Sequence, residues 1–230
     1  MLNYWKNYWN SISILDGLQN QVGRRHKKEP IQDDIFKKTL GFIEDNMQFT
    51  MDSVLLDLCC GNGLLSIPFS KKVRKVTAVD FSEPLLKVLK NGIEDQHIQN
   101  IEIMYGDINT MTFPQEKYSH ILIYFALQHF SEQETIFLFE KAYQCLQPNG
   151  IFYLGDIPDR SKLWDFANTD EYVNMYFDSV KNATPAIGNW FLSEDLSKLA
   201  HYTGFSNCEI IVQPNYQINS RWRFDVKLIK

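Results

Sequence analysis

The sequence predicts an α/β fold, in which a mostly parallel, doubly wound sheet carries helices on both faces. Apolar segments of strand length alternate with helical segments between residues 53 and 155. This alternation is typical of a parallel sheet, because each return to the same edge of the sheet needs a crossover connection. A glycine turn follows the first apolar segment, and the second ends on an acid. We therefore expect a ligand-binding crevice at the carboxyl ends of the strands.

The first part of the chain is expected to be helical. Residues 1–28 are rich in Tyr, Trp and Asn and predict one or two short helices outside the sheet. Residues 32–46 predict a further helix, because apolar side chains repeat there at helical spacing: Ile35, Phe36, Leu40 and Ile43. We interpret residues 1–46 as an N-terminal helical lid and residues 47–230 as a cofactor-binding domain.

Five apolar segments are expected to form the parallel strands: residues 53–58, 75–80, 101–106, 120–125 and 150–155. Ser82 is the expected N-cap of the helix after the second strand. Ser131 and Glu134 have the spacing of a capping box, and the helix that they begin is expected to end before Pro148.

The regular alternation breaks after the fifth strand. Residues 157–190 are aromatic and only partly periodic, and a connection of that length is more often functional than incidental. We expect this insertion to cover a substrate. A helix from Ser193 to Gly204 and two β-rich segments, CEIIVQ and WRFDVKLIK, complete the chain.

The glycine turn lies in the segment VLLDLCCGNGLLS, residues 54–66. Gly61 and Gly63 allow a tight turn and a close approach of backbone to ligand. Asp80 ends the next strand about twenty residues later, where an acid can bind a ribose diol. Asp57 precedes the glycines; its carboxylate would repel a pyrophosphate but could accept hydrogen bonds from an ammonium group. This favours S-adenosylmethionine over NAD.

Between residues 52 and 205 the chain resembles the class I S-adenosylmethionine-dependent methyltransferases. Five segments match in order: LDLCCGNG, VTAVDFS, YGDINTMTF, YSHILIYFALQHF and LQPNGIFYLGD. Cys59 stands where the family usually has glycine, and Ser119 where an acid is common. The resemblance implies a seven-stranded sheet whose final strand is antiparallel, with S-adenosyl-L-methionine as cofactor and S-adenosyl-L-homocysteine as product.

The resemblance also assigns roles to residues. Asp80 would bind the ribose, Phe81 and Ile108 would contact the adenine ring, and Asp107 would accept from its amino group. Ile123 and Tyr124 would border the methyl group. With a lid contact from Tyr8, the full set of expected cofactor-binding residues is Tyr8, Asp57, Cys59, Gly61, Gly63, Asp80, Phe81, Asp107, Ile108, Ile123 and Tyr124. Cysteine spacing indicates no metal site.

His129 follows the fourth strand, near the expected position of the methyl group. Its ordinary pKa suits removal of a proton near neutral pH, so it is our candidate general base. The alternative is that His129 caps or packs beneath the helix beginning at Ser131. The basic run from Arg24 to Lys28 is either a solvated surface or a binding site for an anionic group.

These observations predict methyl transfer to a small-molecule hydroxyl. N-methylation of a small amine and a non-catalytic cofactor-binding protein remain alternatives. A net charge of −5 gives no general attraction to nucleic acid. No segment approaches the roughly 20 apolar residues of a membrane span. Adjacent Cys59 and Cys60 favour a reducing, cytoplasmic location, and we expect a monomer or homodimer.

Overall fold

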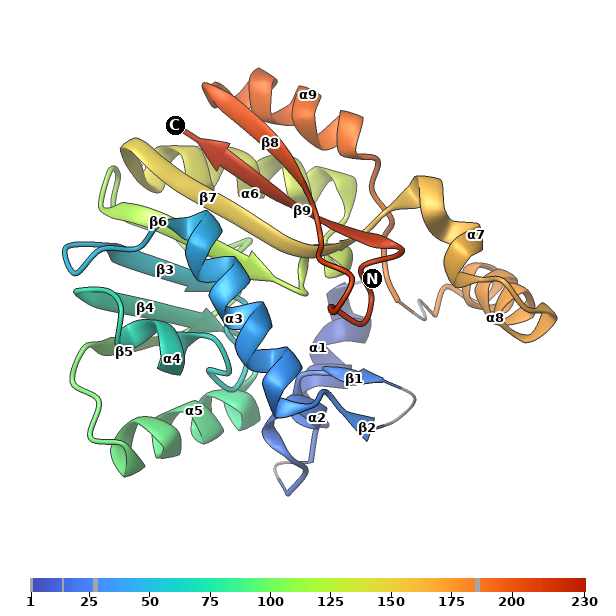
Figure 1. Ribbon diagram of the computed structural model, residues 1–230, viewed down its shortest axis with the longest axis horizontal. Helices are drawn as coiled ribbons and strands as arrows, with labels where there is room; N and C mark the ends of the chain where they lie inside the picture. The colour runs from blue at the N-terminus through green and yellow to red at the C-terminus, as the bar shows by residue number, and fades with distance from the viewer. Residues whose placement is uncertain (1, 14, 27–28, 185–186) are drawn as a thin grey trace.

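The structure is a computed structural model and describes residues 2–13, 15–26, 29–184 and 187–230. A seven-stranded sheet forms its centre, in the order β5-β4-β3-β6-β7-β9-β8 (Figure 1). Its strands are β3 (Val54–Leu58), β4 (Lys75–Asp80), β5 (Ile101–Tyr105), β6 (Tyr118–Tyr124), β7 (Leu146–Pro158), β8 (Asn207–Val212) and β9 (Arg223–Ile229). The short strands β1 (Arg25–His26) and β2 (Glu29–Pro30) pair separately.

The strand directions confirm the predicted fold class. Strands β3 to β7 pair in parallel, whereas β9 runs antiparallel to both of its neighbours, β7 and β8. The predicted end of the helix before Pro148 is confirmed, because the helix ends at Cys145. The strand expected at 150–155 is longer than predicted: β7 begins with Leu146, so that Pro148 and Gly150 lie inside it.

The α-helices are α1 (Leu2–Asn10), α2 (Leu18–Gln21), α3 (Asp33–Met47), α4 (Ser66–Ser70), α5 (Glu83–Asp95), α6 (Glu132–Cys145), α7 (Leu163–Phe166), α8 (Asp170–Lys181) and α9 (Ser193–Thr203). Two 3₁₀ turns, η1 (Leu127–His129) and η2 (Arg160–Lys162), complete the described helical elements.

Local sequence explains several helix ends. The predicted capping box is present at α6, where Ser131 and Glu134 satisfy each other's backbone N–H groups. Gly204 ends α9 with a φ of 107°, a conformation that glycine adopts without strain. Ser82 precedes α5 as predicted, but its hydroxyl does not cap the helix. It donates instead to the carbonyl of Trp9 at 3.0 Å and ties α1 to the end of β4.

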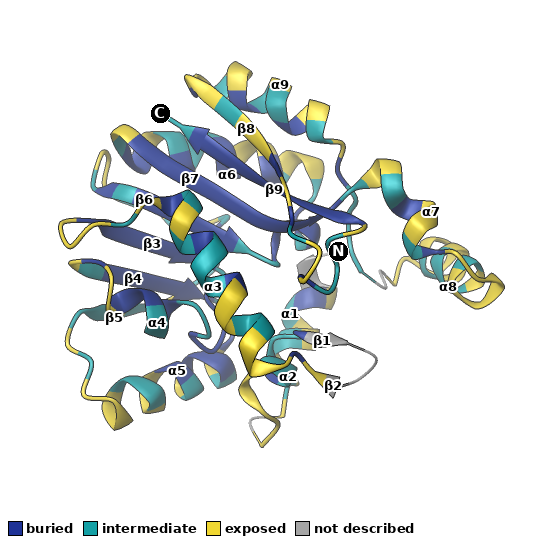
Figure 2. Ribbon diagram, in the orientation of Figure 1, coloured by how far each residue is buried: buried dark blue, intermediate teal, exposed yellow. Residues whose placement is uncertain are grey.

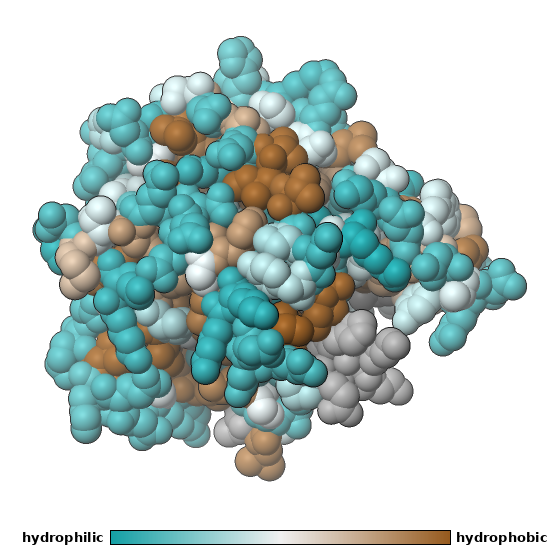
Figure 3. Space-filling view, in the orientation of Figure 1, coloured by the Kyte–Doolittle hydropathy of each residue, from teal (hydrophilic) through white to brown (hydrophobic). Residues whose placement is uncertain are grey.

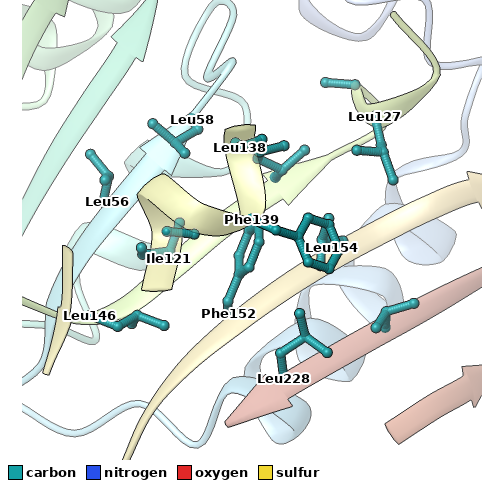
Figure 4. Packing of buried hydrophobic residues seen from close by; sticks show 14 of the residues in the cluster. Leu56, Leu58, Ile121, Leu127, Leu138, Phe139, Leu146, Phe152, Leu154 and Leu228 are labelled. Carbon is teal, nitrogen blue, oxygen red and sulfur yellow. The ribbon is translucent and has the colours of Figure 1, made fainter. Parts of the chain in front are cut away.

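Apolar side chains form one core on each face of the sheet. Figure 4 shows the first, in which Leu56 and Leu58 of β3, Ile121 of β6 and Phe152 of β7 pack with Phe139 of α6. Leu56 and Leu58 lie two residues apart because side chains on one face of a strand recur with a period of two. The core is therefore built from alternate strand positions.

The second core includes Ile43 and Met47 of α3, both fully buried with Leu55 of β3. In Figure 1, α3 crosses the face of the sheet. This helix thus packs as part of the sheet domain, although residues 1–46 were predicted as one lid. Within that segment, α1 and α2 are the helices placed to act as a cover.

The insertion at residues 157–190 contains η2, α7 and α8. Helix α8 buries none of its residues, and Figure 2 shows it mainly exposed at one end of the molecule. The insertion returns to the sheet at Asn189, whose N–H donates to the carbonyl of Gln128 at 2.7 Å. Its carboxyl end therefore lies beside η1.

The surface seen in Figure 3 is mainly hydrophilic, with separate apolar areas near its middle. Among the helices of the described residues, none combines the length and the apolar character needed to cross a membrane.

Candidate functional site

A cavity lies at the carboxyl ends of β3, β4 and β6, with α1 over it. It brings together most of the residues expected to bind the cofactor: Asp57, Cys59, Gly61, Asp80, Phe81, Asp107, Ile108 and Tyr124. His129, the candidate base, lines the same cavity. Parallel strands explain this convergence, because their carboxyl ends share one edge of the sheet.

Three expected contacts do not line the cavity. Gly63 lies against α5, where an added Cβ would be 2.2 Å from Leu89 Cδ1, so this glycine serves helix packing. Ile123 is fully buried in the core because its neighbour Tyr124 takes the cavity side of β6. Tyr8 is 36% exposed; Trp5 and Trp9, on another face of α1, line the cavity instead.

The Asp80 carboxylate is buried and anchored by backbone. It accepts hydrogen bonds of 2.8 Å from the N–H groups of Gly61 and Ser82. Burial raises the pKa of Asp80, and these backbone donors oppose the shift. Each oxygen retains a further acceptor position. Since Asp80 lines the cavity, these free acceptor positions fit the two hydroxyl donors of a ribose diol.

Asp57 is a second buried acid at the cavity, 2% exposed. It accepts a hydrogen bond of 2.5 Å from the Ser66 hydroxyl. Burial raises the pKa of Asp57 to about 7, and the nearby Asp80 charge adds to this effect. No ion pair given for the described residues includes Asp57. A ligand ammonium group would supply the missing positive charge, so the chemistry of this position fits the amino acid end of S-adenosylmethionine.

Asp107 begins the loop after β5 and contacts the helix above the cavity. Its Oδ2 lies 2.8 Å from Lys6 Nζ of α1, and its Oδ1 accepts from the N–H of Asn109 at 3.0 Å. Lys141 of α6 holds the same loop from below, because its ammonium group donates to the carbonyls of Ile108 and Met111. Sequence analysis missed Lys141, whose partners lie about thirty residues away.

The remaining wall of the cavity is aromatic. It is formed by Trp5 and Trp9 of α1 with Phe125, His129 and Phe130. The His129 ring lies 3.9 Å from the Trp5 ring, measured between centroids, and 5.7 Å from that of Trp9. Burial, with a smaller effect of Arg223, lowers the pKa of His129 to about 3. The imidazole is therefore neutral at pH 7 but a weak base.

Behind this wall lies a buried polar network that the sequence did not reveal. Arg24 donates to the carboxylate of Asp156, and its guanidinium lies over the rings of Tyr124 and Phe125 at 5.2 and 5.3 Å. Arg24 begins the basic run whose binding role the sequence left open. Its place is at the cavity, but paired with an acid of β7. Lys27 and Lys28 lie outside the described residues.

Three non-glycine residues at the same edge of the sheet have a left-handed backbone. Cys59, Phe125 and Asp156 have φ angles of 58°, 58° and 59°. Cys59 and Phe125 directly follow β3 and β6, and Asp156 lies in the register shift of β7. Non-glycine residues in this conformation are uncommon and gather at functional sites. The usual family glycine at position 59 is explained by the left-handed backbone there.

The order and directions of the strands are those of the Rossmann-like fold of the class I methyltransferases. Comparison with known families agrees: residues 55–150 match the family model of a methyltransferase domain.

The chain is also similar to a curated relative and to solved structures. Demethylmenaquinone methyltransferase from Listeria welshimeri is 28% identical over 99 residues, which are 42% of this chain and 41% of that protein. The matching part thus spans less than half of the curated relative. A putative methyltransferase from Bacillus halodurans has a TM-score of 0.61 at 20% identity, covering 84% of this chain and 97% of that one.

A second solved structure, phosphoethanolamine N-methyltransferase 2 from Haemonchus contortus, was determined in complex with S-adenosyl-L-methionine. It has a TM-score of 0.67 at 13% identity and covers 84% of this chain and 52% of that one. At these identities both structures support the fold alone.

Proposed function

We propose that this protein transfers the methyl group of S-adenosylmethionine to a hydroxyl oxygen of a small molecule. The observation that carries the proposal is the convergence of Asp57, Asp80 and Asp107 on one cavity. Asp80 is placed to bind the ribose and Asp57 the ammonium group, while Phe81 and Ile108 offer apolar surface to the adenine.

When bound, S-adenosylmethionine would supply a methyl group activated by its sulfonium: a bond from the acceptor oxygen to the methyl carbon would form as the C–S bond breaks, S-adenosylhomocysteine would leave, and the hydroxyl proton would pass to solvent. The protein contributes orientation and exclusion of solvent, which suffice for much of the acceleration of such a step. Aromatic faces of Trp5 and Trp9 would stabilise nearby positive charge. General-base action by His129 stays a prediction, and its low pKa makes the base weak.

The hydrogen bonds of Asp156, the acid beside the aromatic wall, favour a hydroxyl over an amine as the methyl acceptor. The carboxylate of Asp156 accepts from Arg24 and from the amide of Gln213 at 3.2 Å. Asp156 is not among the residues that line the cavity, and its charge is balanced by Arg24, so it offers no counter-ion to the ammonium group of an amine acceptor.

Calorimetric titration with S-adenosylhomocysteine tests the cofactor site. Replacing Asp80 by alanine removes the expected ribose contact, and we expect affinity to fall roughly 10- to 100-fold, which corresponds to about 1.5–3 kcal/mol for charge-assisted hydrogen bonds. Glu83→Gln, an exposed change in the first turn of α5, is the matched control. Wild-type protein that does not bind S-adenosylhomocysteine would refute the proposal, as would methylation of amines but not of hydroxyls in an acceptor panel.

A further inference from the structure

Two polar groups on the aromatic wall of the cavity have no hydrogen-bond partner among the residues that the structure describes. Both ring nitrogens of His129 are buried and unpaired within that part of the chain, and so is the indole Nε1 of Trp5. Trp5 is 6% exposed as a residue, and both side chains line the cavity. Buried polar groups are nearly always hydrogen-bonded, so these exceptions need an explanation.

A ligand would explain the indole nitrogen and one of the imidazole nitrogens. The Trp5 and His129 rings are neighbours, with centroids 3.9 Å apart, so both belong to one small region of the cavity wall. The indole N–H can only donate, whereas a neutral imidazole has one donor and one acceptor nitrogen. A hydroxyl group complements this pair because it can accept from the indole and donate to the imidazole.

The surroundings indicate what carries the hydroxyl. Trp9, Phe125 and Phe130 complete the wall around the two rings, and flat aromatic surfaces favour a flat aromatic ligand. The cations Arg24 and Arg223 stack on Phe125 of this wall, with Asp156 between them. Asp156 is paired with both cations and is not among the residues that line the cavity, so a cationic ligand would gain no counter-ion from it.

We infer that Trp5 and His129 together bind the hydroxyl group of a planar phenol, which is the methyl acceptor. This inference rests on the proposed function, because it places the phenol in the part of the cavity left beside the cofactor. His129 then acts as a binding group for the acceptor oxygen, and its neutral form is the one required.

The test is a calorimetric titration of 2-naphthol into protein saturated with S-adenosylhomocysteine. His129→Phe and Trp5→Phe each keep a ring and remove the polar atoms, and we expect each to weaken 2-naphthol about 3- to 10-fold. Tyr4→Phe is the matched control, since it removes one hydroxyl from the same helix at a side chain that is 38% exposed. 2-Methylnaphthalene, which lacks the hydroxyl, should bind wild type and both variants equally.

The outcomes separate this inference from the function on which it rests. Affinity for S-adenosylhomocysteine, measured first in each protein, reports that the variants are folded and sets the concentration that saturates each of them before 2-naphthol is added. Unchanged 2-naphthol affinity in both variants would overturn the inference alone. Wild-type protein that binds 2-methylnaphthalene as tightly as 2-naphthol, or phenethylammonium more tightly, would overturn it without any variant. Failure of wild type to bind S-adenosylhomocysteine would remove the proposed function itself.

Discussion

At the scale of single residues, burial determines the pKa of Asp57. Its pKa of about 7 in the folded protein lies well above the value of about 3.9 for an unperturbed aspartate. Between these values the folded protein holds a proton that the unfolded chain has lost. The contribution of Asp57 to stability in the absence of ligand therefore falls as pH rises from about 4 to about 7.

This linkage predicts proton release when the cofactor product binds. At pH 6 the Asp57 carboxyl is mostly protonated, and a ligand ammonium group favours its ionised form. Binding of S-adenosylhomocysteine at pH 6 should then release close to one proton, and Asp57→Asn should abolish most of the release. Calorimetry in buffers of different ionisation enthalpy measures this number. Asp52→Asn, an exposed acid just before β3, is the control; equal release from wild type and Asp57→Asn would contradict the assignment.

Sequence predicted the acids better than it predicted the aromatic contacts. Asp57 is the last residue but one of β3 and Asp80 is the last of β4, so strand direction alone brings them to the cavity. By contrast, Tyr8 and Trp9 are adjacent on a short helix, and the choice between them depends on how α1 docks. Ile123 and Tyr124 differ only in which side of β6 each occupies, which is set by packing against the core.

At the scale of elements, α6 positions the loop that carries Asp107. Lys141 bridges two carbonyls of this loop, and Asn109 Nδ2 donates to Glu134 Oε1 at 3.2 Å. The capping box was readable from sequence because its residues are three apart. The hydrogen bonds between α6 and the loop could not be predicted from the sequence, because they join residues that only the folded sheet brings together.

We expect Lys141→Met to loosen this loop. Loss of a charged donor to two backbone carbonyls removes about 1–3 kcal/mol of hydrogen bonding, and part of this loss should appear as a 3- to 10-fold weaker affinity for S-adenosylhomocysteine. The side chain retains its apolar length, so the helix itself is preserved. An adenosine analogue without the exocyclic amino group should be affected less, if Asp107 contacts that group. Gln144→Met, an exposed change on α6, should leave the affinity unchanged; an equal effect in both variants would contradict the positioning role of Lys141.

At the scale of the whole molecule, the N-terminal segment and the sheet are joined by charges far apart in sequence. Arg24 and Asp156 are 132 residues apart, and both are buried. Other contacts join the same parts: Asn62 Nδ2 donates to the carbonyl of Leu18 at 2.7 Å. Composition and periodicity predicted helices before the sheet, but no local pattern identifies which cation pairs with which acid. The basic run that begins at Arg24 is also typical of a solvated surface, so the sequence does not indicate that this arginine is buried.

The buried pair predicts strong coupling between the N-terminal segment and β7. Arg24→Met removes the cation that is hydrogen-bonded to Asp156 and leaves only Arg223, whose Nε lies 3.9 Å from Asp156 Oδ1. Removing one partner of a buried pair costs up to about 3–5 kcal/mol of unfolding free energy. Asn tolerates the left-handed backbone of residue 156, so Asp156→Asn removes the charge without backbone strain. In urea unfolding, the double variant should therefore lose much less stability than the sum of the single variants. The exposed pair of Lys198 and Glu194, 2.7 Å apart, is the control, and Lys198→Met should change little. Additive losses at Arg24 and Asp156 would show that the two parts of the molecule are stabilised independently.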